Sequence, residues 1–147
     1  MRTSPFPIRP RMSWQEQLEG YKLAGRISAK RRSQVHAAVR ASDAASVVLK
    51  VYVHDALGHG GSQAQRELEA LRAAEGPGMP RGLECIETDD AHVLVLERVP
   101  GITLLDWVSG GLPTHRAFVE VAIQLAAALA RVHAAHRIHC DVTPGTS

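Results

Sequence analysis

From Tyr21 to Val99 the chain is dominated by short runs of apolar, often β-branched residues between polar or turn-like groups, and these runs predict β-strands. YKLAGRIS (residues 21–28) and QVHAAVR (34–40) flank the polar group Lys30–Ser33, as the two arms of a hairpin flank their turn. SVVLKVYV (46–53) is a β-branched run with a lysine at its centre. These runs predict three consecutive strands.

The next part of the chain predicts one helix and a second hairpin. SQAQRELEALRAA (62–74) carries leucines at helical spacing, and Ser62 is the expected N-cap of this helix. LECIET (83–88) and HVLVLERV (92–99) are separated by two aspartates, which predicts a second antiparallel hairpin.

Beyond Pro100 and Gly101 the pattern becomes helical. TLLDWV (103–108) predicts a short helix, and a long helix is expected from about Thr114 to Ala135. Because the long segment contains polar side chains among its apolar ones, it suits a buried amphipathic helix better than a membrane span. Its apolar residues advance by three or four and form one stripe: Phe118, Ala122, Leu125, Leu129 and Val132.

Five predicted strands with one helix inserted after the third, followed only by helices, indicate an α+β architecture with two segregated parts. Residues 1–18 form a basic, proline-containing tail that is expected to dock weakly or not at all. Residues 19–98 contain the predicted sheet and its helix, and residues 99–147 contain the later helices.

The composition is that of one globular domain: 147 residues, of which 45% are hydrophobic and 22% charged. A net charge of +2 is too small to argue for nucleic acid or a membrane as a partner, and the basic tail lacks interleaved aromatic residues. No secretory signal is present, so Cys85 and Cys140 are interpreted as reduced thiols of a cytoplasmic protein.

Three places in the chain carry candidate chemistry. Lys50 would put an ammonium on or beside a buried sheet, unless its strand is an edge strand and the lysine points to solvent. Glu67 or Glu69 of the following helix could hold that ammonium, although helical glutamates are usually solvated. Asp141, on a loop after the long helix, could act as a general base or have a structural role.

These candidates occur together and in order: SVVLK, a helix with Glu67, LVLERVPG, a long helix and IHCDVTPGT. Over residues 21–146 this order resembles the eukaryotic-type protein kinase family, in particular the kinase-like domains at the front of large bacterial signalling proteins. The resemblance implies an N-lobe with a five-stranded antiparallel sheet plus one helix, and the first helices of an incomplete helical C-lobe. It also implies ATP and Mg²⁺ as cofactors, and protein Ser/Thr side chains as substrates.

The resemblance implies a role for each matched residue. Lys50 corresponds to the lysine that binds the α- and β-phosphates of ATP, Glu67 to its ion-pair partner, and Asp141 to the catalytic base. Leu96 corresponds to the gatekeeper before the hinge, whose backbone faces adenine. The positions implied to bind the nucleotide are Ser28, Lys30, Ser33, Val35, Val48, Lys50, Leu96, Glu97 and Val99.

The chain departs from the family pattern in the phosphate loop. The three glycines of that loop fall on Ser28, Lys30 and Ser33, and backbone amides approach phosphates less closely past side chains. Either Lys30, Arg31 and Arg32 supply charge in place of these amides, or they form a solvated hairpin tip. We favour the solvated tip because runs of charge usually face water.

The catalytic loop departs as well. Cys140 replaces the arginine of H-R-D, and Thr146 stands where the family has a magnesium-binding asparagine, although a hydroxyl is the poorer ligand. The chain ends at Ser147 without a D-F-G motif, so we expect no appreciable kinase activity from this chain alone. An uncovered long helix would favour self-association, or a partner protein that supplies or covers the missing C-lobe.

Two other functions stay open. The same lobe could be a non-catalytic nucleotide-binding or protein-interaction module. It could also belong to a small-molecule phosphotransferase of the aminoglycoside-kinase type, whose catalytic loop likewise contains H-x-D. A strand-helix-strand insert after the hinge is absent, which favours the protein-kinase branch. In each case Lys50 and Asp141 are expected to face one nucleotide cleft.

Overall fold

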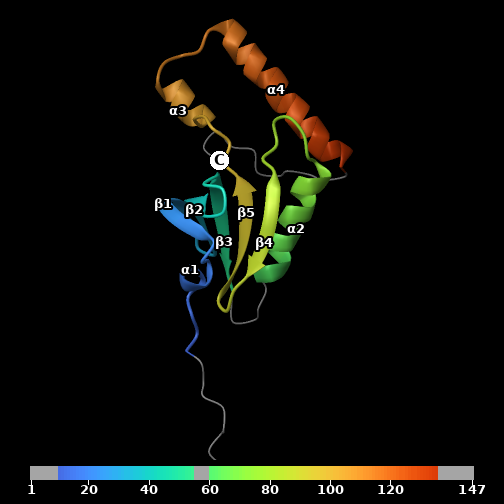
Figure 1. Cartoon of the computed structure of the whole chain (residues 1–147). Coiled ribbons are helices and arrows are strands. Elements are labelled where there is room, and N and C mark those ends of the chain that lie inside the picture. Colours follow the sequence, from blue (N-terminus) through green and yellow to red (C-terminus); the bar gives the residue numbers. More distant parts are fainter. Residues whose placement is uncertain (1–9, 55–59, 136–147) are drawn as a thin grey trace, which may run out of the picture.

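The computed structural model describes residues 10–54 and 60–135, and in this part of the chain it is an α+β structure with one antiparallel sheet (Figure 1). The strand order is β1-β2-β3-β5-β4. Up to residue 135, one helix follows the third strand and only helices follow the fifth, so the expected α+β architecture is confirmed, with one unexpected helix before the first strand. The strands are β1 Tyr21–Ala29, β2 Ser33–Arg40, β3 Ser46–Val53, β4 Gly82–Glu87 and β5 Ala91–Glu97. The helices are α1 Trp14–Gln17, α2 Gly60–Ala73, α3 Leu104–Ser109 and α4 His115–Ala134.

Both expected hairpins are present, and β3 lies between them in the sheet. In the β1–β2 turn the backbone N–H of Lys30 donates to the Ser33 carbonyl at 2.7 Å. In the β4–β5 turn the Thr88 hydroxyl accepts the backbone N–H of Ala91 at 3.1 Å. Strand β3 pairs with β2 on one side and with β5 on the other. The interpretation of Lys50 as an edge-strand lysine is therefore wrong.

The sheet buries apolar side chains on both faces, because successive residues of a strand point to opposite sides. Val47, Leu49 and Val51 of β3 belong to one buried cluster, which also contains Trp14 and Leu18 from the N-terminal segment. The opposite face carries a second cluster below α2, formed by Tyr52, Ala64, Leu68 and Leu94. The side chain of Lys50 points to this second face, since it lies two residues from Tyr52.

The N-terminal segment docks on the first face, contrary to the expectation of a weakly docked tail over residues 1–18. Trp14 and Leu18 are only 6% and 5% exposed, and the Trp14 ring packs on His36 with ring centroids 5.1 Å apart. The backbone N–H of Asp89 donates to the Gln17 side chain at 3.0 Å, which ties α1 to the β4–β5 turn. The charges and prolines of this segment predicted a tail, but residues Trp14–Gln17 form one short amphipathic helical turn.

Helix α2 lies close to the sheet because glycine occupies two positions where they meet, Gly61 in the helix and Gly82 in β4. A Cβ atom at Gly82 would lie 2.8 Å from Leu68 Cδ1, and one at Gly61 would lie 2.5 Å from the His92 ring. The helix begins at Gly60, so Ser62 lies within the first turn and the prediction that it caps the helix is wrong. Leu68 is buried and Leu71 packs beside it, as their helical spacing predicts.

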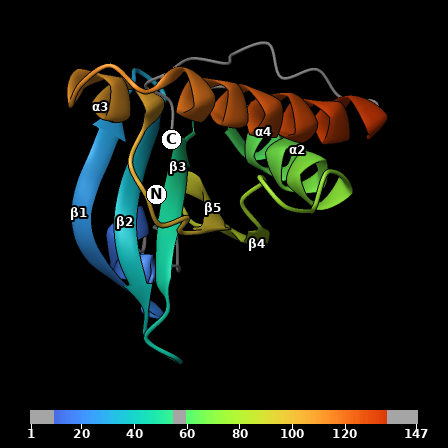
Figure 2. The same ribbon diagram turned by 90° about the horizontal axis from the view of Figure 1, so that it is seen from above.

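Helices α3 and α4 lie beyond one end of the sheet, and α4 returns to the loop that follows α2 (Figures 1 and 2). Thr103 and Thr114 cap them by accepting the backbone N–H groups of Asp106 and Ala117. Arg131 of α4 donates to the carbonyl of Pro77 in that loop. The expected bounds of the long helix are confirmed.

The apolar stripe of α4 is largely uncovered in the described chain. Phe118, Ala122 and Leu125 are exposed, and within the described chain Val132 is the one buried residue of this helix. By length and composition alone α4 could also cross a membrane, a test that core helices of soluble proteins pass as well. The self-association expected from this uncovered stripe stays a prediction.

Replacing the docked tryptophan tests the role of the N-terminal segment. We expect Trp14→Ala to lower the free energy of unfolding by about 3–5 kcal/mol, because a large buried ring leaves a cavity. Urea denaturation measures the change. Leu112→Ala is the control, since Leu112 is 93% exposed and its loss should change stability by less than about 0.5 kcal/mol. Equal effects of the two substitutions would contradict docking of α1.

One buried and one half-buried histidine predict that the fold weakens in acid. Burial lowers the pKa of His36 and of His92 below the usual 6.5, Arg26 and His54 respectively lower them further, and Glu87 opposes the shift at His92 only in part. Below pH 6.5 the unfolded chain therefore binds protons that the folded chain does not, so stability falls as the pH falls. We expect a lower urea midpoint at pH 5.5 than at pH 7.5, and a smaller difference in the double variant His36→Gln/His92→Gln. A midpoint independent of pH in this range would refute the effect.

Candidate functional site

An ion pair between the central strand and α2 is the centre of the candidate site. Lys50 Nζ donates to both carboxylate oxygens of Glu67, at 2.8 and 2.9 Å. The two side chains are 30% and 29% exposed, so the pair lies partly within the protein. The neighbouring Glu69 is exposed. The structure therefore selects Glu67 from the two candidate glutamates, because only one face of the helix turns toward β3.

Tyr52 is a third member of this site, and sequence reasoning missed it. Its hydroxyl donates to Glu67 Oε2, and its side chain is buried, with 3% exposure. Lys50 Nζ lies 5.4 Å from the centroid of the Tyr52 ring. Burial, followed by the hydrogen bond to Glu67, raises the pKa of Tyr52 far above its usual value, so the phenol remains a donor at neutral pH. The spacing of two residues along β3 could have indicated that Tyr52 shares a face with Lys50.

The strand register puts the implied nucleotide-binding residues on the same face of the sheet as Lys50. Ser28 pairs with Val35, and Val35 pairs with Lys50, so these three residues form one row across β1, β2 and β3. Val48 and Leu96 pair in the neighbouring row. Side chains directly opposite each other in an antiparallel sheet lie on one face. The structure thus brings together five positions that are far apart in sequence.

This face of the sheet is covered unevenly. Helix α2 packs on β4, β5 and β3, whereas every residue of β1 after Tyr21 is exposed. Val35 and Val48 are half-buried at the border between the covered and the open part. A flat apolar group with a charged end would therefore find apolar side chains and an ammonium side by side.

The hairpin tip projects beyond the row that contains Lys50. Lys30, Arg31 and Arg32 are exposed, and Ser33 next to them pairs with Tyr52. Two residues along a strand correspond to about 7 Å, so the tip cations begin about that distance from the lysine row. Exposure of these residues fits a solvated tip and a charged phosphate cover equally well.

The predicted hinge is positioned by the start of β4. The Glu97 backbone N–H donates to the Arg81 carbonyl at 2.9 Å, and the Glu97 carboxylate accepts the Arg81 backbone N–H at 3.3 Å. Leu96 packs against the cluster below α2, whereas Val99 is 62% exposed. A base bound here would have to use the Glu97 carbonyl or the backbone at Val99, because the Glu97 N–H is already engaged.

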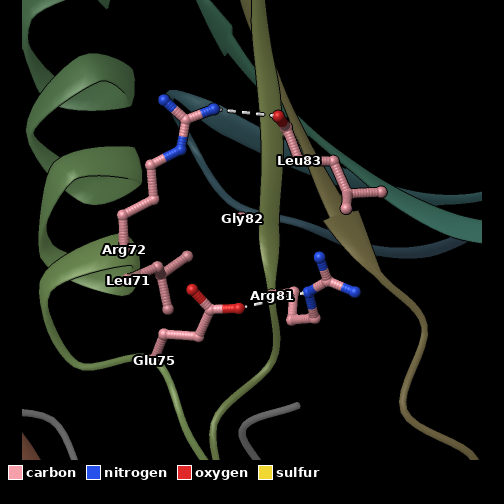
Figure 3. A pocket seen from close by; sticks show the side chains of 6 residues that line it. All are labelled: Leu71, Arg72, Glu75, Arg81, Gly82 and Leu83. Carbon is pink, nitrogen blue, oxygen red and sulfur yellow. Dashed lines mark hydrogen bonds and ion pairs between the residues drawn. The ribbon is translucent and has the colours of Figure 1, made fainter.

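The described surface contains a cavity of about 360 Å³ at the C-terminal end of α2, away from Lys50 (Figure 3). Arg72 there donates to the Leu83 carbonyl at 3.0 Å, and Arg81 pairs with Glu75 at 3.3 Å. A second cavity of about 380 Å³ lies next to it and includes Glu97 and Val99 in its lining. Both cavities lie along the loop between α2 and β4, and neither is lined by Lys50 or Glu67.

The second half of the predicted site cannot be compared with the structure. Asp141 and Thr146, together with Cys140, lie outside the described residues. The expected cleft between Lys50 and Asp141 therefore stays a prediction. Within residues 10–54 and 60–135, no three His, Cys, Asp or Glu side chains are grouped to hold a metal ion.

Comparisons with known proteins find partial similarity to bacterial kinases. The chain is 36% identical over 101 residues, 67% of its length, to the serine/threonine-protein kinase pkn2 of Myxococcus xanthus. It is 26% identical over 81 residues, 54% of its length, to the serine/threonine-protein kinase PrkC of Bacillus subtilis (strain 168). The matched part is 12% of each kinase. No protein-family model matches the chain. These similarities support a kinase-like domain, with which the five-stranded sheet is compatible.

The choice of Glu67 over Glu69 can be tested by stability. We expect Glu67→Ala to lower the free energy of unfolding by about 1–3 kcal/mol, because Lys50 and Tyr52 both lose their acceptor. Glu69→Ala on the same helix is the matched control and should change stability by less than about 0.5 kcal/mol. Chemical denaturation of the two variants provides the comparison. A loss at Glu69 as large as that at Glu67 would contradict the ion pair as the source of the effect, since alanine has the higher helix propensity and does not by itself destabilise the helix.

Proposed function

We propose that this chain is the nucleotide-binding part of a kinase-like module, in which Lys50 binds phosphates of ATP. The observation that carries the proposal is the ion pair of Lys50 with Glu67 on the half-open face of the sheet. An ammonium has three N–H donors, and Glu67 engages two of them. Among the described residues the third has no acceptor and could bind an anion, and the lysine is already held where that anion would bind.

The surroundings of Lys50 suit a nucleotide better than a simple anion. Val35, Val48 and Leu96 offer half-buried apolar surface in rows beside the lysine, on which a base could stack. The backbone of Glu97 to Val99 follows directly and would provide the hydrogen bonds that distinguish one base from another. Small-molecule sites commonly combine apolar walls with a few placed polar groups of this kind.

For the kinase-like module as a whole, the proposed reaction is ATP-dependent phosphoryl transfer to protein serine or threonine, and the lack of appreciable activity expected of this chain alone stays a prediction. Asp141 would accept the proton of the substrate hydroxyl, whose oxygen attacks the γ-phosphorus while ADP leaves. Thr146 would contribute to holding Mg²⁺, as a weaker ligand than an amide oxygen. The two similar proteins are serine/threonine-protein kinases, which supports this reaction class. Both are much longer proteins, so their activity remains a proposal for this chain.

A non-catalytic nucleotide-binding module is the second candidate. Ser28, Lys30 and Ser33 stand where close backbone contacts to phosphates would require glycine, which favours binding over efficient transfer. A small-molecule phosphotransferase is supported less well, because the partial similarities are to serine/threonine-protein kinases.

Titration with Mg-ATP tests the proposed function. We expect a thermal shift and a measurable dissociation constant for the unmodified chain, and loss of both in Lys50→Met, which removes the phosphate-binding ammonium. The control is Lys22→Met, because Lys22 is an exposed lysine on β1 and its loss should leave the affinity unchanged.

The triple alanine variant of Lys30, Arg31 and Arg32, titrated in the same way, distinguishes a charged phosphate cover from a solvated tip. Weaker binding that depends on salt would support the cover, and an unchanged affinity would support the tip. Absence of any Mg-ATP binding to the unmodified chain would overturn the proposed function. Phosphate transfer to a serine-containing protein by the same preparation would separate the catalytic from the non-catalytic candidate.

A further inference from the structure

The carboxylate of Glu67 receives hydrogen bonds from two residues of the same strand. Lys50 donates to both of its oxygens, and the Tyr52 hydroxyl donates to Oε2. Lys50 and Tyr52 are two residues apart on β3, about 7 Å along the strand, and both point to the face below α2. The carboxylate is thus held between two donors that belong to one rigid element.

We propose that Tyr52 is a positioning residue, which holds the Glu67 carboxylate against Lys50 when no nucleotide is bound. The inference rests on the proposed role of Lys50 in binding phosphate. Tyr52 itself would not contact the nucleotide, because its side chain is buried in the cluster with Ala64, Leu68 and Leu94.

The physical reason lies in the freedom of the two long side chains. Lysine and glutamate each lose considerable rotamer entropy when they are held in one geometry, so an ion pair between them alone is loosely defined. Tyr52 has a planar ring fixed by packing on both α2 and β5. Its hydroxyl defines where one carboxylate oxygen lies, and this in turn defines where the ammonium lies. A group positioned before the ligand arrives binds more tightly, because less ordering is required on binding.

The ring and the hydroxyl of Tyr52 have different roles, and one substitution separates them. Tyr52→Phe keeps the buried ring and removes only the donor to Glu67. If Tyr52 has a purely structural role, this variant lowers stability but changes neither the chemical reactivity of the Lys50 amine nor the affinity for nucleotide.

The chain contains a matched control for this substitution. Its other tyrosine, Tyr21, also donates its hydroxyl to a glutamate, Glu84. Tyr21 packs on the opposite cluster, whereas Glu84 is exposed, and no lysine is among the hydrogen-bond partners of this pair in the described residues. Tyr21→Phe therefore removes the same kind of hydrogen bond without touching Lys50.

The experiment compares the unmodified chain, Tyr52→Phe and Tyr21→Phe by two readouts. The first is the rate of reductive methylation of Lys50 without nucleotide, followed by peptide mass spectrometry. We expect Tyr52→Phe to raise this rate severalfold, because an amine that Glu67 holds less firmly is more accessible to the reagent. The second readout is the Mg-ATP dissociation constant, which we expect to increase about 3-fold to 10-fold in Tyr52→Phe. Both values should stay within about twofold in Tyr21→Phe.

A Glu67→Gln background completes the test, because Tyr52 is proposed to act only through the Glu67 carboxylate. In that background the additional change Tyr52→Phe should alter neither readout further. An equal or slower methylation of Lys50 in Tyr52→Phe overturns the proposal, since Tyr52 would then be neutral or would compete with Lys50. If methylation changes as expected while no variant binds Mg-ATP, the positioning role is upheld and the proposed function fails.

If Tyr52→Phe does not fold, a variant that keeps the phenol gives the answer. In Tyr21→Phe labelled with 3-fluorotyrosine, Tyr52 is the one labelled residue. We expect its ¹⁹F NMR resonance to shift and broaden when Glu67→Gln or Lys50→Met is added. A resonance that is unaffected by either change overturns the proposal.

Discussion

A positively charged lysine at the centre of the sheet is the constraint on which the rest of this structure depends. Strand β3 has neighbours on both sides, so the ammonium of Lys50 cannot turn to water at an edge. Leaving such a charge partly buried without a counter-charge is costly, and Glu67 supplies the counter-charge from the helix above. Because the glutamate must reach the lysine, the position of α2 over β3, β5 and β4 follows from this one pair together with the packing around it.

The packing around the pair is arranged so that the helix can come close. Gly61 and Gly82 remove side chains where α2 meets the His92 ring and where β4 passes below Leu68. Tyr52 makes both apolar and polar contacts: its ring packs in the apolar cluster, and its hydroxyl donates to Glu67. Polar and apolar contacts therefore determine the same helix position. A helix fixed by both kinds of contact suits the proposed site, in which Lys50 is positioned before an anion binds.

The two parts of the described chain differ in how completely they are covered. The sheet is packed on both faces, by α1 on one side and by α2 on the other. Helices α3 and α4 lie at one end of the sheet, and apolar residues such as Ile102, Phe118 and Ile123 remain exposed there. The similarity to two bacterial kinases extends over only 12% of their length. The sheet is compatible with a kinase-like domain, and the roles of Lys50, Glu67 and Asp141 in nucleotide binding and catalysis remain proposals.

Local sequence pattern determined the elements of this protein, and the tertiary structure decided how they act on one another. The hairpin pattern around YKLAGRIS and the β-branched run SVVLKVYV were sufficient to predict strands, and the long apolar stripe was sufficient to predict α4, since these depend on neighbours within a few residues. The choice of Glu67 over Glu69, the central place of β3 and the contribution of Tyr52 depend on which faces meet across the fold. The burial of Trp14 and Leu18 has the same origin, because a segment of four helical residues is stable only when a sheet receives its side chains. Local propensity cannot reveal such partners, for they are brought together only when distant strands pair.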